Sequence, residues 1–175
     1  MSIQKPFNFQ KWIQKNKDFL KPPVGNKCVY KKAGDFIIMV VGGPNQRKDY
    51  HYNETEEFFY QLKGDIILRI QENKKPVDIN IKEGEIFLLP SRTPHSPIRP
   101  ENSIGLVMEL HRKGKQKDGL LWYCDKCNHK LYETYFPLKN IEKDFLPRFK
   151  TFYKSIKLRT CSKCKTIMEV DKRFV

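Results

Sequence analysis

Two histidines and one glutamate have the residue types and the spacing of a metal site. His51 and Glu57 stand on either side of a short polar turn, and His95 follows later in the chain. Two imidazoles and one carboxylate form a three-ligand face on a metal ion and leave the opposite positions open for a substrate and dioxygen. We therefore expect the rest of the chain to bring these three side chains together.

The segment before His51 is predicted to be extended. Because side chains alternate along a strand, Arg47, Asp49 and His51 would point to the same side. After the polar turn, residues 57–62 have the composition of a second strand, so Glu57 would return close to His51. This segment alone also allows a second interpretation, in which His51 and Glu57 are solvated turn residues.

His95 lies in a proline-rich segment. Residues 84–89 form a short apolar run, and the segment 90–100 that follows contains four prolines. Proline fixes φ and has no N–H to donate, so we expect a rigid, non-helical loop that holds His95 in one orientation. This second half of the pattern favours a metal site over the solvated interpretation.

The two segments together resemble the paired motifs of the cupin superfamily. The matching positions are Gly43, Asp49, His51, Glu57 and Gly64 in the first motif and Gly84, Pro90, Arg92, His95 and Arg99 in the second. Asp49 stands where many cupins have their first histidine, which implies three protein ligands. Arg99 stands where many have asparagine.

A narrower resemblance covers nearly the whole chain. The chain is similar to the 3-hydroxyanthranilate 3,4-dioxygenase family. The features that carry this resemblance are the two departures at Asp49 and Arg99, residues 22–24, residues 41–45 and four cysteines near the end. The resemblance implies a mainly β fold, the cupin double-stranded β-helix or jelly-roll barrel. The fold would also include an N-terminal helix and a small C-terminal extension that is held together by a metal ion. A homodimer is also implied.

The implied reaction is oxidative cleavage of an aromatic ring. 3-Hydroxyanthranilate and O2 would give 2-amino-3-carboxymuconate 6-semialdehyde, which cyclises to quinolinate, the precursor of NAD. Catalytic Fe(2+) would be held by the metal ligands His51, Glu57 and His95. Arg47 and Arg99 would bind the substrate carboxylate, and Glu109 would contact the substrate beside Glu57 and transfer the proton.

Short apolar runs between turn signals predict an antiparallel barrel or sandwich. These runs are residues 28–30, 36–41, 57–62, 66–70, 77–81, 86–89 and 104–110. Glu109 interrupts the last run, and an unpaired buried carboxylate is costly, so it is either exposed at an edge or placed in a cavity. An opening helix is predicted after Asn8, a candidate N-cap, and Pro22 and Pro23 would end it. Cys28 is interpreted as a buried core thiol.

Two Cys-x-x-Cys pairs near the end predict a tetrahedral metal site. The four thiolates are Cys124, Cys127, Cys161 and Cys164. Such a set binds zinc or iron and leaves no open position, which favours a structural or electron-transfer role. The family resemblance implies rubredoxin-like iron here. His129 could compete as a ligand, whereas His111 is interpreted as a surface residue.

The charged residues 113–119 are interpreted as a linker. We therefore expect a barrel domain with its N-terminal helix over residues 1–112 and the C-terminal extension over 113–175. Within the extension, residues 138–153 have a helical apolar pattern that Pro147 interrupts.

The composition narrows the cell compartment and the partners. The 175 residues contain no apolar signal-peptide core and no stretch approaching a membrane span, so we expect a cytoplasmic protein with no membrane partner. Five cysteines in a reducing compartment favour metal ligands or free thiols over disulfides. The net charge of +14 fits a soluble surface or steering of an anionic substrate, and the dispersed lysines favour no nucleic-acid partner.

Two rival functions stay open from the residues alone. A non-catalytic cupin that binds a ligand or a protein would keep the barrel without a redox metal. A zinc-ribbon nucleic-acid binder would use the positive charge and the cysteine pairs, and its binding would fall with salt.

Overall fold

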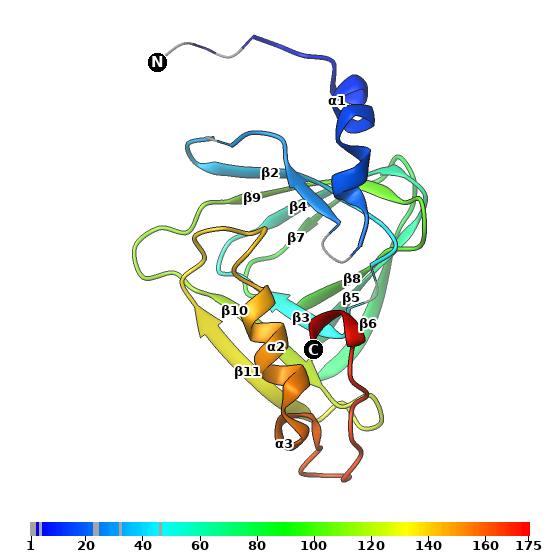
Figure 1. Ribbon diagram of the computed structural model, residues 1–175, viewed down its shortest axis with the longest axis vertical. Coiled ribbons are helices and arrows are strands. Elements are labelled where there is room, and N and C mark those ends of the chain that lie inside the picture. The colour runs from blue at the N-terminus through cyan, green and yellow to red at the C-terminus, as the bar shows by residue number, and fades with distance from the viewer. Residues whose placement is uncertain (1–2, 4, 23–24, 32, 46) are drawn as a thin grey trace.

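Two antiparallel sheets face each other in the computed structural model, which describes residue 3 and residues 5–22, 25–31, 33–45 and 47–175 (Figure 1). In spatial order, the five-stranded sheet contains β1 (Asn26–Cys28), β2 (Phe36–Gly42), β9 (Ile104–Leu110), β4 (Glu57–Lys63) and β7 (Ile86–Leu89). The six-stranded sheet contains β11 (Lys130–Phe136), β10 (Asp118–Tyr123), β3 (Asp49–Tyr52), β8 (His95–Ile98), β5 (Ile66–Glu72) and β6 (Lys75–Ile81). This arrangement confirms the predicted mainly β fold with two packed antiparallel sheets.

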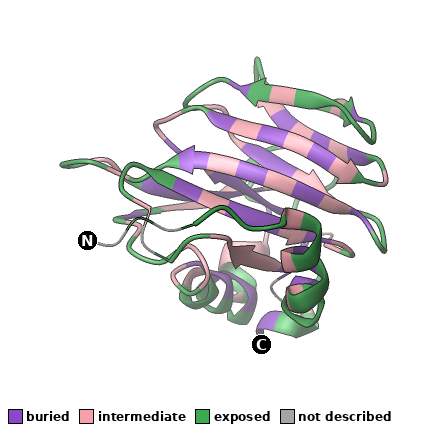
Figure 2. Cartoon of the chain, turned by 90° about the horizontal axis from the view of Figure 1, so that it is seen from above, coloured by how far each residue is buried: buried purple, intermediate pink, exposed green. Residues whose placement is uncertain are grey.

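Strands such as β4 and β5 bury one face and present the other toward the surface. In β4 and β5, buried and partly exposed residues alternate along the chain, as the banding in Figure 2 shows. The buried side chains of both sheets meet in one apolar core between them, for example Met39 of β2, Phe59 of β4 and Leu68 of β5. Because successive side chains of a strand point to opposite faces, a polar residue at one of the inward positions points into the space between the sheets.

The N-terminal helix α1 (Phe9–Asn16) begins where the sequence predicts. Asn8 caps it by accepting the backbone N–H of Lys11 at 2.8 Å. The chain continues as the 3-10 helix η1 (Lys17–Leu20), and Ile13 and Leu20 pack on Val40 at the outer face of the five-stranded sheet. The helical stretch ends before Pro22. Residues 23 and 24 of the predicted stop and family motif lie outside the described residues.

The segment around His95 is a strand, where the sequence predicted a loop. β8 pairs with β5 from Ile70↔His95 to Ile67↔Ile98, and with β3 only at His51↔His95. Pro97 is accommodated because the pairing with β3 has already ended before it, so its missing N–H interrupts no bond on that side.

The predicted linker is also shorter than expected. Asp118 and Gly119 belong to β10, and Asp118 is fully buried. A charged residue is tolerated there because it is paired with His51 and Arg112. β10 pairs with β3 over four residues, so the six-stranded sheet continues past position 112. The boundary at 112–113 stays a prediction.

After β11 the extension forms helices that cover one face of this sheet. They are α2 (Leu146–Lys154), α3 (Ile156–Arg159) and the 3-10 helix η2 (Lys172–Phe174). The helix predicted over 138–153 begins only at Leu146, because Pro147 fits the first turn, where no N–H is needed. Phe149 and Phe152 of α2 pack on Leu120 and Trp122 of β10. No described helix has the length and apolarity to span a membrane.

Candidate active site

Three side chains from both sheets meet between them. His51 of β3 is paired directly with His95 of β8, while Glu57 begins β4 in the opposite sheet. The Glu57 Oε2 lies 3.2 Å from the His95 Nε2 and 3.8 Å from the His51 Nδ1. Adjacent ligands of an octahedral ion with bonds near 2.1 Å are roughly 3.0 Å apart. All three residues are buried, and their donor set and spacing fit a metal ion.

Each histidine is oriented through its second ring nitrogen. The His95 Nδ1 lies 3.0 Å from the Thr93 carbonyl oxygen, so it donates there and leaves Nε2 free for a metal. The His51 Nε2 lies 2.6 Å from the Asp118 carboxylate, so Nδ1 faces Glu57. Such partners fix the tautomer and ring angle of a ligand histidine.

Glu57 is prepared to act as an anion. Burial alone would raise its pKa, but the nearby His95 and His51 outweigh burial and hold the pKa of Glu57 below its usual value. The Asn53 amide also donates to the Glu57 Oε2 at 3.1 Å. A negatively charged oxygen is therefore retained at the centre of the candidate metal site.

Glu109 lies beside Glu57, because the two are directly paired between β4 and β9. Of the two places that the sequence left open for it, edge or cavity, the structure shows the cavity, where Glu109 is only 2% exposed. Burial and the charge of Glu57 raise the pKa of Glu109 to about 7, although Arg112 and His51 oppose this. A carboxyl group with such a pKa can both accept and release a proton near neutral pH.

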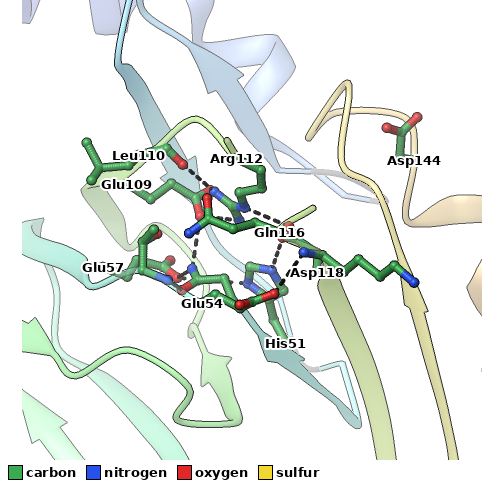
Figure 3. A network of polar contacts seen from close by, with 12 residues as sticks. His51, Glu54, Glu57, Glu109, Leu110, Arg112, Gln116, Asp118 and Asp144 are labelled. Atoms are coloured by element: carbon green, nitrogen blue, oxygen red, sulfur yellow. Dashed lines mark hydrogen bonds and ion pairs between the residues drawn. The ribbon is translucent and has the colours of Figure 1, made fainter. Parts of the chain in front are cut away.

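Arg112 joins Glu109 to Asp118, as Figure 3 shows. Its Nη2 donates to the Glu109 Oε2 at 2.7 Å and its Nε donates to the Asp118 Oδ1 at 2.6 Å. Asn53 also reaches the Glu109 Oε2 at 3.1 Å. One guanidinium thus supports both the carboxylate that orients His51 and the carboxylate beside the candidate metal.

Sequence reasoning missed Arg112, Asp118 and Asn53. Arg112 and Asp118 stand in a charged stretch that is typical of a surface linker, so nothing in their surroundings indicated burial. Asn53 lies between two predicted ligands, and this position was the only signal available for it.

Both predicted arginines line the cavity that the three ligands face. Arg99 is 1% exposed and donates from Nη1 to the Gln61 Oε1 at 3.2 Å. Burial lowers the pKa of Arg99 to about 10, while the charge of Glu57 acts in the opposite direction. Arg47 lies at another part of the wall, with its side chain 18% exposed. The cavity therefore offers two guanidinium groups to an anionic ligand.

The C-terminal extension completes the apolar wall of the cavity. Ile141, Phe145 and Phe149 line it opposite barrel residues such as Met39 and Val107. The ring of Phe145 lies 5.0 Å from that of His51, measured between centroids. A flat aromatic molecule would be enclosed by apolar side chains with polar groups at a few points, which is typical of small-molecule sites.

The four cysteines of the extension also come together. Sγ–Sγ distances are 3.5 Å between Cys124 and Cys164 and 3.6 Å between Cys127 and Cys161. These are too long for disulfides but near the roughly 3.8 Å edge of a tetrahedron with 2.3 Å metal–sulfur bonds. The set fits a metal ion.

The other histidines and cysteine lie outside both sites. His111 is exposed, and His129 contacts Ser162 and is not part of the four-cysteine cluster. Cys28 is half-buried, where the sequence predicted a buried thiol, because its position at the end of β1 leaves one side open. Its backbone N–H donates to Glu142, and burial, together with Glu142, raises the pKa of the thiol to about 11.

The chain is similar to several known proteins in structure and in sequence. Among solved structures, a cupin-2 domain containing protein from Shewanella frigidimarina is 16% identical, with a TM-score of 0.45, and the match covers 59% of this chain and 99% of that chain. A protein of Brucella anthropi named 3-hydroxyanthranilate 3,4-dioxygenase is 49% identical over 164 residues, 92% of this chain and 90% of that protein.

A protein of the same name from Xanthomonas euvesicatoria is 54% identical over 169 residues, which cover 97% of this chain and 95% of that protein. The family model described as 3-hydroxyanthranilic acid dioxygenase matches residues 1–153. The match of this model to most of the chain, together with relatives about half identical over nearly their full length, shows that the chain belongs to the 3-hydroxyanthranilic acid dioxygenase family.

Proposed function

We propose that this chain cleaves the ring of 3-hydroxyanthranilate with O2 to give 2-amino-3-carboxymuconate 6-semialdehyde, which cyclises to quinolinate on the route to NAD. The observation that carries the proposal is the meeting of His51, Glu57 and His95 in a cavity that also holds Arg47 and Arg99. The family assignment supplies the substrate, and the cavity supplies groups that suit its carboxylate.

The metal in this proposal is Fe(2+), held by His51, Glu57 and His95. Two imidazole nitrogens and one carboxylate are typical of non-haem ferrous oxygenases. When bound, the iron supplies the redox chemistry that allows an aromatic molecule to react with triplet dioxygen. The second partners of the histidines, the Thr93 carbonyl and the buried Asp118, keep them in place for it.

Arg47 and Arg99 bind the substrate carboxylate. A guanidinium pairs with a carboxylate through two parallel hydrogen bonds, which fixes the rotation of the attached ring as well as its affinity. Arg99 is buried, and its Nε has no hydrogen-bond partner within the described part of the chain. An incoming carboxylate would satisfy this group. The ring rotation then decides which carbon faces dioxygen.

Glu109 moves the proton. Its Oε2 already accepts from Arg112 and Asn53, whereas its Oε1 is buried and has no hydrogen-bond partner among the residues described. We assign to Oε1 the proton that the substrate hydroxyl loses on binding. Arg112 keeps the carboxyl group aimed into the cavity, so the same guanidinium serves proton transfer and, through Asp118, the orientation of His51.

The four-cysteine site holds zinc or iron in a structural role. It joins the turn between β10 and β11 to the chain after α3, and so fixes the segment that carries α2. The proposed assembly is a homodimer, and the proposed location is the cytoplasm.

The test is a single-turnover experiment. Protein loaded anaerobically with ferrous iron is mixed with 3-hydroxyanthranilate and then with O2, and ring opening is followed optically. Zinc-loaded protein is the control and should bind substrate without opening it. Iron-loaded protein that binds the substrate but leaves the ring intact after O2 addition would support a non-catalytic binding cupin instead.

A further inference from the structure

The side chain of Arg47 is enclosed by two parts of the chain that are far apart in sequence. From its own segment, Asp49 places its Oδ1 3.4 Å from the Arg47 Nε. From the C-terminal extension, the ring of Phe149 in α2 lies 5.1 Å from the guanidinium carbon, and the ring of Phe145, just before α2, lies 5.8 Å from it. Both rings also line the cavity, so Arg47 contacts them at the cavity wall.

Asp49 is an unusual carboxylate. It is 1% exposed, and neither of its side-chain oxygens has a hydrogen-bond partner within the described residues. Arg47 is the only cation within ion-pair distance of it among those residues. A buried carboxylate is costly unless it is paired with a cation. The Arg47 guanidinium therefore has to stay near Asp49 to stabilise its charge.

Asp49 does not join the metal ligands, although it stands where many cupins have a histidine. Asp49 and His51 are two residues apart on β3 and share the inward face. However, Asp49 is paired with Trp122 of β10, whereas the ligand cluster contains only His51, Glu57 and His95 among the described residues. Asp49, which replaces the histidine of many cupins, therefore lies next to Arg47 and the helical extension.

We propose that Asp49 and Phe149 are positioning residues that hold Arg47 in the orientation that binds the substrate carboxylate. This inference rests on the proposed function. Asp49 engages the Nε of the guanidinium, and Phe149 supports its face. The two Nη groups remain available for two parallel hydrogen bonds to a carboxylate. The extension thus determines substrate orientation through Arg47, without contributing a metal ligand.

The test compares two substrates that differ only in the carboxylate. Asp49→Asn keeps the size of the side chain but removes its charge, and Phe149→Leu keeps an apolar side chain without the ring. Each should lower kcat/KM for 3-hydroxyanthranilate about tenfold or more, since small misplacements of binding groups are costly. Turnover of 2-aminophenol, which lacks the carboxylate, and the iron content of the barrel should change little.

Two matched variants control for general loosening. Phe152→Leu alters the same helix, at a ring that stacks on Trp122 with centroids 4.4 Å apart. Asp78→Asn removes an aspartate that pairs with Arg69 at the surface. Neither variant should change the preference between the two substrates. A double-mutant cycle with Arg47→Ala adds a second criterion, because Asp49→Asn should have almost no further effect once Arg47 is gone.

Four outcomes oppose the inference or support it. The inference would be overturned if folded Asp49→Asn and Phe149→Leu proteins both kept the wild-type preference between the two substrates. It would also be overturned if Asp49→Asn lost the barrel iron, because Asp49 would then be a metal ligand. Equal effects of Phe149→Leu and Phe152→Leu on the preference would also overturn it. The inference is supported if Asp49→Asn narrows the preference for 3-hydroxyanthranilate over 2-aminophenol in the wild-type background but has no such effect in protein that also carries Arg47→Ala.

Failure of the proposed function is distinguishable from these results. It would show as iron-loaded wild-type protein that opens neither ring. Anaerobic dissociation constants for the same two molecules would then decide the role of Asp49 and Phe149, because carboxylate binding does not require turnover. If Asp49→Asn does not fold, Phe149→Leu alone decides between the outcomes.

Discussion

The two candidate metal sites of this chain are built in different ways. The barrel site takes three ligands from β3, β4 and β8, whose positions the two sheets fix, and a further layer of partners orients those ligands. The cysteine site takes four ligands from two turns, one after β10 and one after α3, and leaves no position for a substrate. An incomplete ligand set on rigid strands suits chemistry, whereas a complete set on turns suits the joining of segments.

The sharpest way to test this contrast is to remove one barrel ligand. His95→Ala should abolish binding of the catalytic metal and lower turnover by at least about 1,000-fold, equivalent to about 4 kcal/mol. The cysteine site should keep its metal. Metal analysis, circular dichroism and turnover on the same sample check this. Full turnover in a folded His95→Ala protein would contradict the ligand assignment.

The next largest effect concerns the cavity side of the barrel site. Arg99→Ala should reduce kcat/KM for 3-hydroxyanthranilate by a factor of about 30 to several thousand, since losing one partner of a desolvated charge pair costs about 2–5 kcal/mol.

Arg92→Ala is the matched control. Arg92 lies on the same segment, but its side chain is 69% exposed and its only ion pair among the described residues is a 3.9 Å contact with Glu54. Exposed pairs contribute about 1 kcal/mol or less, so kcat/KM should stay close to wild type. Similar losses in the two variants at low salt would argue against a carboxylate clamp.

The support behind the barrel ligands should have a smaller effect. Asp118→Asn leaves the three ligands in place but weakens the orientation of His51, so metal affinity should fall about 10- to 100-fold. Competition with a chelator measures it. Asp35→Asn removes an aspartate that pairs with Lys113 at the surface and should leave metal affinity unchanged. Equal affinities for both variants would mean that Asp118 does not orient His51.

The smallest effect on chemistry is expected at the cysteine site. Cys124→Ser and Cys161→Ser should lower Tm by about 5–10 °C, which corresponds to about 2–3 kcal/mol for a chain of this length. Turnover of protein with a filled barrel site should stay within a few-fold of wild type. Cys28→Ser is the control, since this thiol belongs to neither site. A large loss of turnover in a folded, barrel-loaded variant would indicate electron transfer through the cysteine site.

The parts that the sequence predicted are those in which one segment carries its own signal. Asn8 indicates the start of α1, and the Cys-x-x-Cys pairs indicate a metal site whatever surrounds them. His51, Glu57 and His95 were named from spacing, and the structure brings them together.

The parts that escaped prediction depend on contacts across long stretches of sequence. Asp118 and Arg112 look like surface charges until β10 pairs with β3 and brings Asp118 to His51. The contact between Arg47 and Phe149 likewise exists only once α2 covers the sheet. Period and composition describe a single element and contain no information about such partners.

The pairing of β10 with β3 has a consequence for the order of events during synthesis. While the ribosome is still making the later part of the chain, β3 is an edge strand with unpaired backbone groups. His51 has no carboxylate to orient it until Asp118 has emerged and β10 has docked. The nascent barrel already contains the three candidate ligands, but His51 gains its orienting partner only after that late strand is in place.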